Sequence, residues 1–341
     1  MEYQFQHSGK FGMLTFNNVY TDLPGNRFQL SDGTWGMPGI PVPDIGIWKE
    51  WIGSIRTERL ARANLVLFIE ESSTDPEIVD AVHKRLGDDL SQLFYFVHLR
   101  AGIECESADL LLGSSRGATP EIRQMSQFAT FYQSKGYRRA PITTQWLEDA
   151  VALRAGVMAM DADKSEFRRV IRGLNTLFKG LQETGQDRLH QFVRSLEALI
   201  LPDIGKTEKQ FAHRCQTFAR AGDDTRALLL EAFAMRSDTE HLHSWDEAVQ
   251  NYPADQRENV CWHRTRQIEQ LSCDAYSRLL RDAALRNYFR TDVAIAAFWK
   301  LADDQRRTLW GKPVDIAAEP LVQKYDQWES TISGKERPYE P

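Results

Sequence analysis

Residues 163–200 read DKSEFRRVIRGLNTLFKGLQETGQDRLHQFVRSLEALI, and the spacing of their apolar side chains decides the fold class. In the first half, apolar residues recur every three or four positions, at Phe167, Val170, Ile171, Leu174, Leu177 and Leu181. In the second half they recur at Leu189, Phe192, Val193, Leu196 and Ile200. This period predicts amphipathic helices over 163–185 and 187–201. Asp163 and Glu166 have the spacing of a capping box at the start of the first helix.

The same helical pattern continues toward the C-terminus. A third helix is expected over 207–222, a fourth begins at Asp223 or Asp224, and a long helical segment covers about 255–290. Amphipathic helices on short connections are typical of an antiparallel bundle. The sequence therefore predicts a helical bundle domain over 160–341 that ends in a C-terminal helical extension.

The N-terminal part carries the signals of mixed structure. Short apolar runs at 64–69 (NLVLFI) and 93–99 (LFYFVHL) are compatible with buried strands, and the second is also compatible with a helix. From about residue 121 the pattern is helical and stays so. The expected fold class is mainly α: a smaller mixed α/β domain of unknown role over 1–155, followed by the helical bundle.

The charge balance narrows the class of partner. The 341 residues carry 42 Lys and Arg against 48 Asp and Glu, a formal net charge of −6. This balance argues against the broad basic surface of a non-specific duplex binder, but not against a small local phosphate site. No run approaches the ~18 uncharged apolar residues of a membrane-spanning helix, and the start lacks a secretory signal pattern. We expect a cytoplasmic protein with no membrane partner and with free cysteine thiols.

Two further patterns are weighed as catalytic or metal sites. Residues 113–117 (GSSRG) match the G-x-S-x-G nucleophile elbow, but a hydrolase needs later βα units that carry Asp and His. A turn that caps a helix is the preferred interpretation, and a loop that cradles phosphate is the lesser alternative. His213 with Cys215, and Cys261 with His263, stand two residues apart. On a helix such side chains project about 200° apart and cannot chelate one ion, so we expect no metal and no cofactor.

The fourth helix contains an interruption of its apolar stripe. Extended from Leu229 by helical arithmetic, the stripe passes through Arg236, Glu240 and His243. Buried charge is costly unless it is paired, so this face holds either a functional site or an ion pair. In the functional interpretation Arg236 binds a phosphate and a histidine transfers protons. The alternative is a structural pair between Arg236 and Glu240 at i, i+4.

These residues resemble a known family. RSDTEH, from Arg236 to His241, fits the R-x4-6-H motif of the HEPN superfamily, helical bundles that include many ribonucleases. RLHQFVRSLEALI at 188–200, with its acidic Glu197, looks like the second bundle helix of the ApeA-like branch. FAHRCQTFA at 211–219 is similar to its third helix, and AFAMRSDTEHLH at 232–243 to its ending, including the serine, here Ser237. The resemblance covers about residues 165–290.

Which histidine accompanies Arg236 stays open. Both His241 and His243 satisfy the permitted spacing. On a continuous helix His241 lies about 140° around from Arg236, whereas His243 is nearly eclipsed with it. Similarity to the branch favours His241 and helical geometry favours His243.

The resemblance implies a metal-independent endoribonuclease, in a family where many members are toxins or antiviral defence effectors. A 2′-hydroxyl would attack the adjacent phosphate, with His241 or His243 as acid or base and Arg236 on the phosphate. Glu197 would orient Arg236, and Ser237 and Glu240 are further supporting residues. The resemblance also implies a homodimer, RNA as substrate, and a protein partner reached through the N-terminal domain. The alternative is an inactive HEPN module for dimerisation and for RNA or protein binding, since Glu240 can neutralise Arg236.

Overall fold

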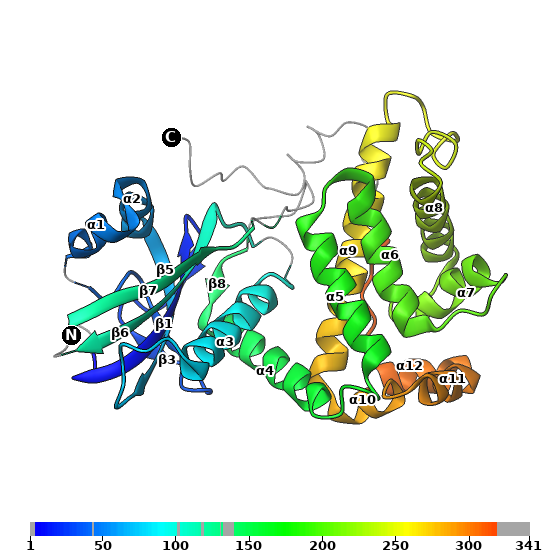
Figure 1. The fold of residues 1–341 in the computed structure, drawn as a ribbon. Coiled ribbons are helices and arrows are strands. Elements are labelled where there is room, and N and C mark those ends of the chain that lie inside the picture. The colour runs from blue at the N-terminus through cyan, green and yellow to red at the C-terminus, as the bar shows by residue number, and fades with distance from the viewer. Residues whose placement is uncertain are drawn as a thin grey trace. The chain divides into compact units, whose positions relative to one another are not determined.

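The structure is a computed structural model that describes residues 4–42, 44–100, 103–116, 119–129, 131 and 140–318. The chain divides into two compact units (Figure 1). The N-terminal unit ends at Arg154 and the C-terminal unit begins at Ala155, so that the boundary falls inside α4 (Thr144–Asp161). Among the described residues, none of the helices has both the length and the apolar composition needed to cross a bilayer.

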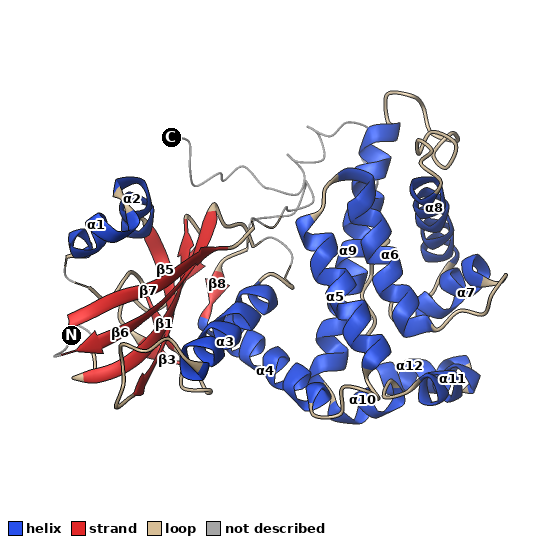
Figure 2. Cartoon of the chain, viewed as in Figure 1, coloured by secondary structure: helices blue, strands red, loops and turns tan. Residues whose placement is uncertain are grey.

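The N-terminal unit is built on a six-stranded sheet in which every neighbouring pair is antiparallel (Figure 2). The strand order is β3-β4-β5-β1-β6-β7. The strands are β1 (Ser8–Asn17), β3 (Phe28–Gln29), β4 (Trp35–Met37), β5 (Ala63–Ser72), β6 (Ser107–Arg116) and β7 (Thr119–Gln127). A separate parallel pair joins β2 (Thr21–Asp22) to β8 (Ile142–Thr143).

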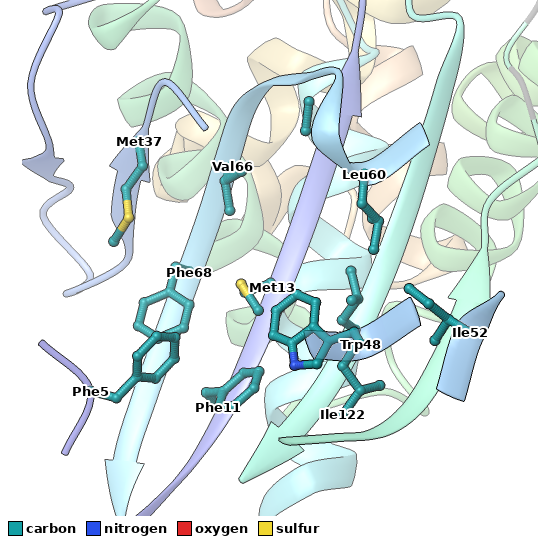
Figure 3. Close-up of a cluster of buried hydrophobic side chains, with 12 residues drawn as sticks. Phe5, Phe11, Met13, Met37, Trp48, Ile52, Leu60, Val66, Phe68 and Ile122 are labelled. Carbon is teal, nitrogen blue, oxygen red and sulfur yellow. The ribbon is translucent and has the colours of Figure 1, made fainter. Parts of the chain in front are cut away.

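Helices cover both faces of this sheet. The 3-10 helix η1 (Ile45–Trp48), α1 (Lys49–Ile52) and α2 (Ser54–Ala61) contribute Trp48, Ile52 and Leu60 to a cluster that includes Phe11 and Met13 of β1 (Figure 3). On the opposite face α3 (Ala81–Val97) packs on β1 and β6. Because successive residues of a strand point to opposite faces, both faces of β1 are buried and the strand lies at the centre of the unit.

The expected fold class is wrong. The chain is mixed rather than mainly α, and its N-terminal unit is organised by a six-stranded sheet rather than being a small mixed appendage. Residues 64–69 lie in β5 as predicted, and 93–97 lie in α3, which is the helical alternative for the second run, with His98 as the C-cap. The helix expected from residue 121 is instead strand β7, whose polar edge-strand sequence EIRQMSQ has no apolar run to mark it.

The GSSRG segment also differs from its prediction. Its first four residues, Gly113 to Arg116, are the end of β6 rather than a turn that caps a helix, and Gly117 lies outside the described residues. Gly113 is required because a Cβ there would lie 2.2 Å from the Phe11 ring and 2.4 Å from the Glu121 carbonyl oxygen. This glycine therefore serves sheet packing.

The described part of the C-terminal unit is helical. Its main helices are α5 (Arg168–Gln182), α6 (Gly185–Ile200), α7 (Thr207–Arg214), α8 (Asp223–Glu240) and α9 (Arg257–Arg281). Shorter elements are η2 (Cys215–Thr217), α10 (Ala283–Tyr288), α11 (Asp292–Lys300) and α12 (Asp303–Trp310). Helix α6 packs against α5, α8 and α9, so it lies at the centre of the unit (Figure 1). The helices predicted over 163–201 and from 223 are present with slightly different ends.

Two local expectations in this unit are wrong. Asp163 and Glu166 do not cap α5, whose N-cap is Phe167; both carboxylates instead bond the guanidinium of Arg290. The fourth helix does not continue to His243, because α8 ends at Glu240. Arithmetic on a continuous helix therefore does not describe where that histidine points.

Candidate functional site

Polar side chains of α6 and α8 meet where these two helices pack together. Arg236 of α8 donates from Nη2 to Glu197 Oε2 of α6 at 3.4 Å, and from Nη1 to Glu240 one turn further along α8. The Arg236 side chain is 13% exposed, that of Glu197 15% and that of Glu240 42%. We call these three residues the Arg236 cluster. It places one largely covered guanidinium between two carboxylates.

The Arg236 cluster leaves hydrogen-bonding capacity unused. Arg236 Nε and Glu197 Oε1 are buried and have no hydrogen-bond partner among the described residues. The guanidinium also lies 5.5 Å from the centre of the Phe233 ring, which limits the directions from which a further acceptor can approach. Buried polar atoms are normally bonded, so the Arg236 cluster has one donor and one acceptor to offer to a further partner.

Burial changes the acid–base character of Glu197. Desolvation raises its pKa above the ordinary glutamate value, and the positive charges of Arg236 and Arg194 partly oppose this shift. Glu240 contributes a further increase through like-charge repulsion. A carboxyl with a raised pKa exchanges protons closer to neutral pH than a surface glutamate does.

A third histidine, His190 of α6, belongs to the same environment. It is half-buried, and its pKa is lowered first by desolvation and then by the charges of Arg236 and Arg194. Our sequence reasoning did not select it, although the signal was present: His190, Arg194 and Glu197 stand at i, i+4 and i+7 of one helix and therefore share a face. His190 is neutral at neutral pH and can act as a proton acceptor.

The two histidines of the motif lie at the end of α8 and are exposed. His241 is the C-cap, and the amide of His243 donates to the Asp238 carbonyl oxygen at 2.8 Å across Leu242, whose φ is +59°. This closing turn is a Schellman motif. The two imidazole centres are 6.1 Å apart. Within the described part of the chain, no hydrogen bond joins either imidazole to Arg236, so the geometry leaves both histidines as candidates.

The remaining supporting residue, Ser237, is half-buried, and its carbonyl oxygen accepts from the His241 amide at 3.1 Å. It contributes to the turn that carries the histidines. The structure therefore brings together Arg236, Glu197 and Glu240, and it attaches His241 and His243 to the same helix end.

Nothing in the described residues resembles a metal centre. No three His, Cys, Asp or Glu side chains converge there in an arrangement that could hold an ion. The four cysteines are free thiols. Burial raises the pKa of Cys261 to about 12, so this thiol is protonated and unreactive at neutral pH. The chemistry available at the Arg236 cluster is that of a cation and carboxylates, to which the nearby histidines add imidazoles.

Comparison of the chain with protein-family models, with curated proteins and with solved structures finds no match. The class of protein is therefore inferred from the fold, the Arg236 cluster and the sequence motif. The helical unit carries Arg236 near the end of α8, with His241 and His243 in the turn that closes this helix.

Proposed function

We propose that the C-terminal unit is a metal-independent endoribonuclease of the HEPN type. The observation that carries the proposal is the position of Arg236: half-buried Glu197 holds its guanidinium, its Nε is unused, and its helix is followed by two histidines. The R-x4-6-H spacing and the resemblance of the flanking helices to the ApeA-like branch support the same assignment.

The proposed reaction needs only groups of this chain and the RNA. The 2′-oxygen forms a bond to the adjacent phosphorus and the bond from phosphorus to the 5′-oxygen breaks, which leaves a 2′,3′-cyclic phosphate and a 5′-hydroxyl. One imidazole, of His241 or His243, accepts the 2′-hydroxyl proton, and a protonated group returns a proton to the 5′-oxygen. Arg236 bonds the phosphate oxygens and offsets the negative charge that develops on them.

The two carboxylates have different roles in this proposal. Glu197 is the more covered one and orients the guanidinium from α6. Glu240 is more exposed and occupies Arg236 Nη1, so a phosphate has to displace it before Arg236 can bind with both of its outer nitrogens. In this scheme Glu240 competes with the substrate.

The proposal includes the expectations that accompany the family resemblance. Two copies of the chain form a homodimer in which the motifs face one groove, and the N-terminal unit recruits a protein partner. The activity acts in the cytoplasm on RNA, as that of a toxin or a defence effector. Expression of the wild type from an inducible promoter then arrests growth, and expression of an Arg236→Ala variant does not.

A second candidate function is a non-catalytic HEPN module for dimerisation and for RNA or protein binding. One observation favours it: the charge of Arg236 is neutralised by two carboxylates, and only 13% of its side chain is exposed. In that case the ion pairs of the Arg236 cluster only hold α6 against α8, and His241 and His243 are surface residues without a catalytic role.

Cleavage of a mixed RNA pool in EDTA distinguishes the two candidates. The wild type is compared with Arg236→Ala, His241→Ala and His243→Ala, and with Arg226→Ala as a matched control, because Arg226 is an exposed arginine of the same helix. Thermal melting verifies that each variant folds. Loss of cleavage in a folded Arg236→Ala variant, with the control active, supports the ribonuclease, and the histidine whose loss matters identifies the proton carrier. An inactive wild type, with Arg236→Ala only less stable, supports the module.

A further inference from the structure

An open groove of the C-terminal unit lies beside the Arg236 cluster. It runs between α5 and α6 near the start of α11 and has a volume of about 820 Å³. Four of its lining residues are arginines, three from α5 and one from α6, at Arg168, Arg169, Arg172 and Arg194. Three acids also line it, at Glu166, Glu197 and Asp292.

Two of these acids, Asp292 and Glu166, form ion pairs with arginines. Asp292 accepts from Arg169 through both oxygens, at 2.7 Å from Nε and 3.0 Å from Nη2. Glu166 bonds the guanidinium of Arg290, which does not line the groove. Neither carboxylate is therefore available to neutralise another arginine of the groove.

The third acid, Glu197, links the groove to the candidate site. Its Oε2 accepts from Arg236 at 3.4 Å, and the positive charge of Arg194 acts on the same carboxyl by lowering its pKa. Because Glu197 lines the groove and belongs to the Arg236 cluster, a ligand that follows the groove past Arg194 reaches the residue that holds Arg236.

Three arginines of the groove have no carboxylate within 4 Å in the part of the chain that the structure describes. These exposed residues are Arg168, Arg172 and Arg194. Arg168 and Arg172 stand one turn apart on α5, so their side chains lie on the same face of the helix. The first turn of α5 contains no acidic residue, although the positive end of a helix dipole favours acids and disfavours arginine there. This arrangement opposes helix stability and creates a local positive field in a chain of net charge −6.

We propose that this groove binds the phosphodiester backbone of single-stranded RNA and delivers it to the Arg236 cluster. A row of exposed guanidiniums spread over two helices suits successive phosphates of one strand, because each Arg can bond one phosphate with two donors. A duplex takes a broader basic surface than three arginines provide. The delivery step rests on the proposed function, whereas the binding step does not.

The test measures binding of the full chain to a fluorescein-labelled 2′-O-methyl RNA of about 12 nucleotides by fluorescence anisotropy. This RNA has no 2′-hydroxyl, so it binds without being cleaved. Neutralisation of three phosphates on a single strand predicts a slope of log K against log salt of about −2. Arg172→Glu and Arg194→Glu each weaken binding by roughly tenfold and make the slope less steep by about 0.7. The matched control is Arg226→Glu, which makes the same charge change on α8 outside the groove lining.

The outcomes separate this inference from the proposed ribonuclease. If the wild type binds and only the groove variants weaken, while normal RNA remains uncut, the groove inference holds and the ribonuclease proposal fails. If normal RNA is cut but Arg172→Glu and Arg194→Glu bind like the wild type, the groove inference is overturned. Equal weakening by Arg226→Glu also overturns it, because the effect is then general charge. Competition by inorganic phosphate at the concentration of RNA phosphates shows a single-phosphate site and overturns the strand interpretation.

Discussion

Glu240→Gln tests whether Arg236 is a phosphate-binding residue that a neighbouring carboxylate holds at rest. In the wild type a phosphate has to replace Glu240 at Arg236 Nη1. Exposed ion pairs contribute about 0.2–1 kcal/mol. The upper end applies here because the Arg236 side chain is only 13% exposed, although Glu240 is 42% exposed. Glutamine keeps the shape of the side chain and removes its charge. The free-energy cost of displacing this side chain from Arg236 therefore falls by about 1 kcal/mol, which corresponds to a roughly fivefold increase in kcat/KM.

The assay is cleavage of a fluorogenic RNA in EDTA under conditions where the rate is proportional to kcat/KM. Glu208→Gln is the control, because it removes one negative charge from an exposed position of α7. Melting temperatures are compared in parallel to verify folding, since loss of this pair lowers stability by at most about 1 kcal/mol. A folded Glu240→Gln chain that cleaves no faster than the wild type refutes the competition. An increase of the same size in Glu208→Gln attributes the effect to net charge.

Three further predictions concern the framework that holds the site. Glu269→Gln removes a carboxylate whose Oε2 lies 2.9 Å from Nη2 of buried Arg188. We expect this change to lower the free energy of unfolding, measured by urea denaturation, by about 3 kcal/mol, and an unchanged urea midpoint contradicts the prediction. Gly173→Ala places a Cβ 1.9 Å from Tyr276 Oη and lowers stability by about 1–3 kcal/mol, despite alanine's helix propensity, and a raised melting temperature would be the contrary result. Burial lowers the pKa of His263 to about 3. The contribution of the neutral imidazole to the free energy of unfolding is therefore complete above pH 6.5 and falls by roughly 1 kcal/mol per pH unit as the pH drops from 6.5 toward 3. His263→Gln reduces this pH dependence of stability, and an identical dependence in the variant contradicts the prediction.

The sequence predicts the helices better than the sheet, for a physical reason. The stripe from Phe167 to Leu181 repeats over four turns, so its period is unmistakable. Strand β1 reads SGKFGMLTFN and is buried on both faces between helices, so it shows no alternation of polar and apolar residues. Strand β7 is an edge strand with a largely polar sequence. Neither strand carries the pattern from which a strand is normally predicted.

From residue spacing alone, the candidate site was predictable where it depends on one helix and not where it depends on two; the contact of Glu197 with Arg236 was expected only from the family resemblance. The pair between Arg236 and Glu240 follows from i, i+4 spacing, and it is present. The proximity of His190 to Arg236 depends on how α6 packs against α8, which no spacing within one segment specifies. The position of His243 depends on the turn after Glu240, where Leu242 takes a positive φ that is unusual for leucine.

Glu197 connects the two parts of the proposed mechanism, because it is the residue that both the groove and the Arg236 cluster share. A strand held by Arg172 and Arg194 brings phosphates to a carboxylate whose pKa burial already raises. A nearby phosphate adds negative charge, which raises that pKa further and favours protonation of Glu197. The neutral carboxyl still accepts from Arg236 Nη2 through its Oε2, so Glu197 keeps the guanidinium oriented while the phosphate displaces Glu240 from Nη1. The ion pair with Glu240 that covers Arg236 Nη1 without RNA is therefore compatible with a catalytic role, because the strand itself displaces that carboxylate.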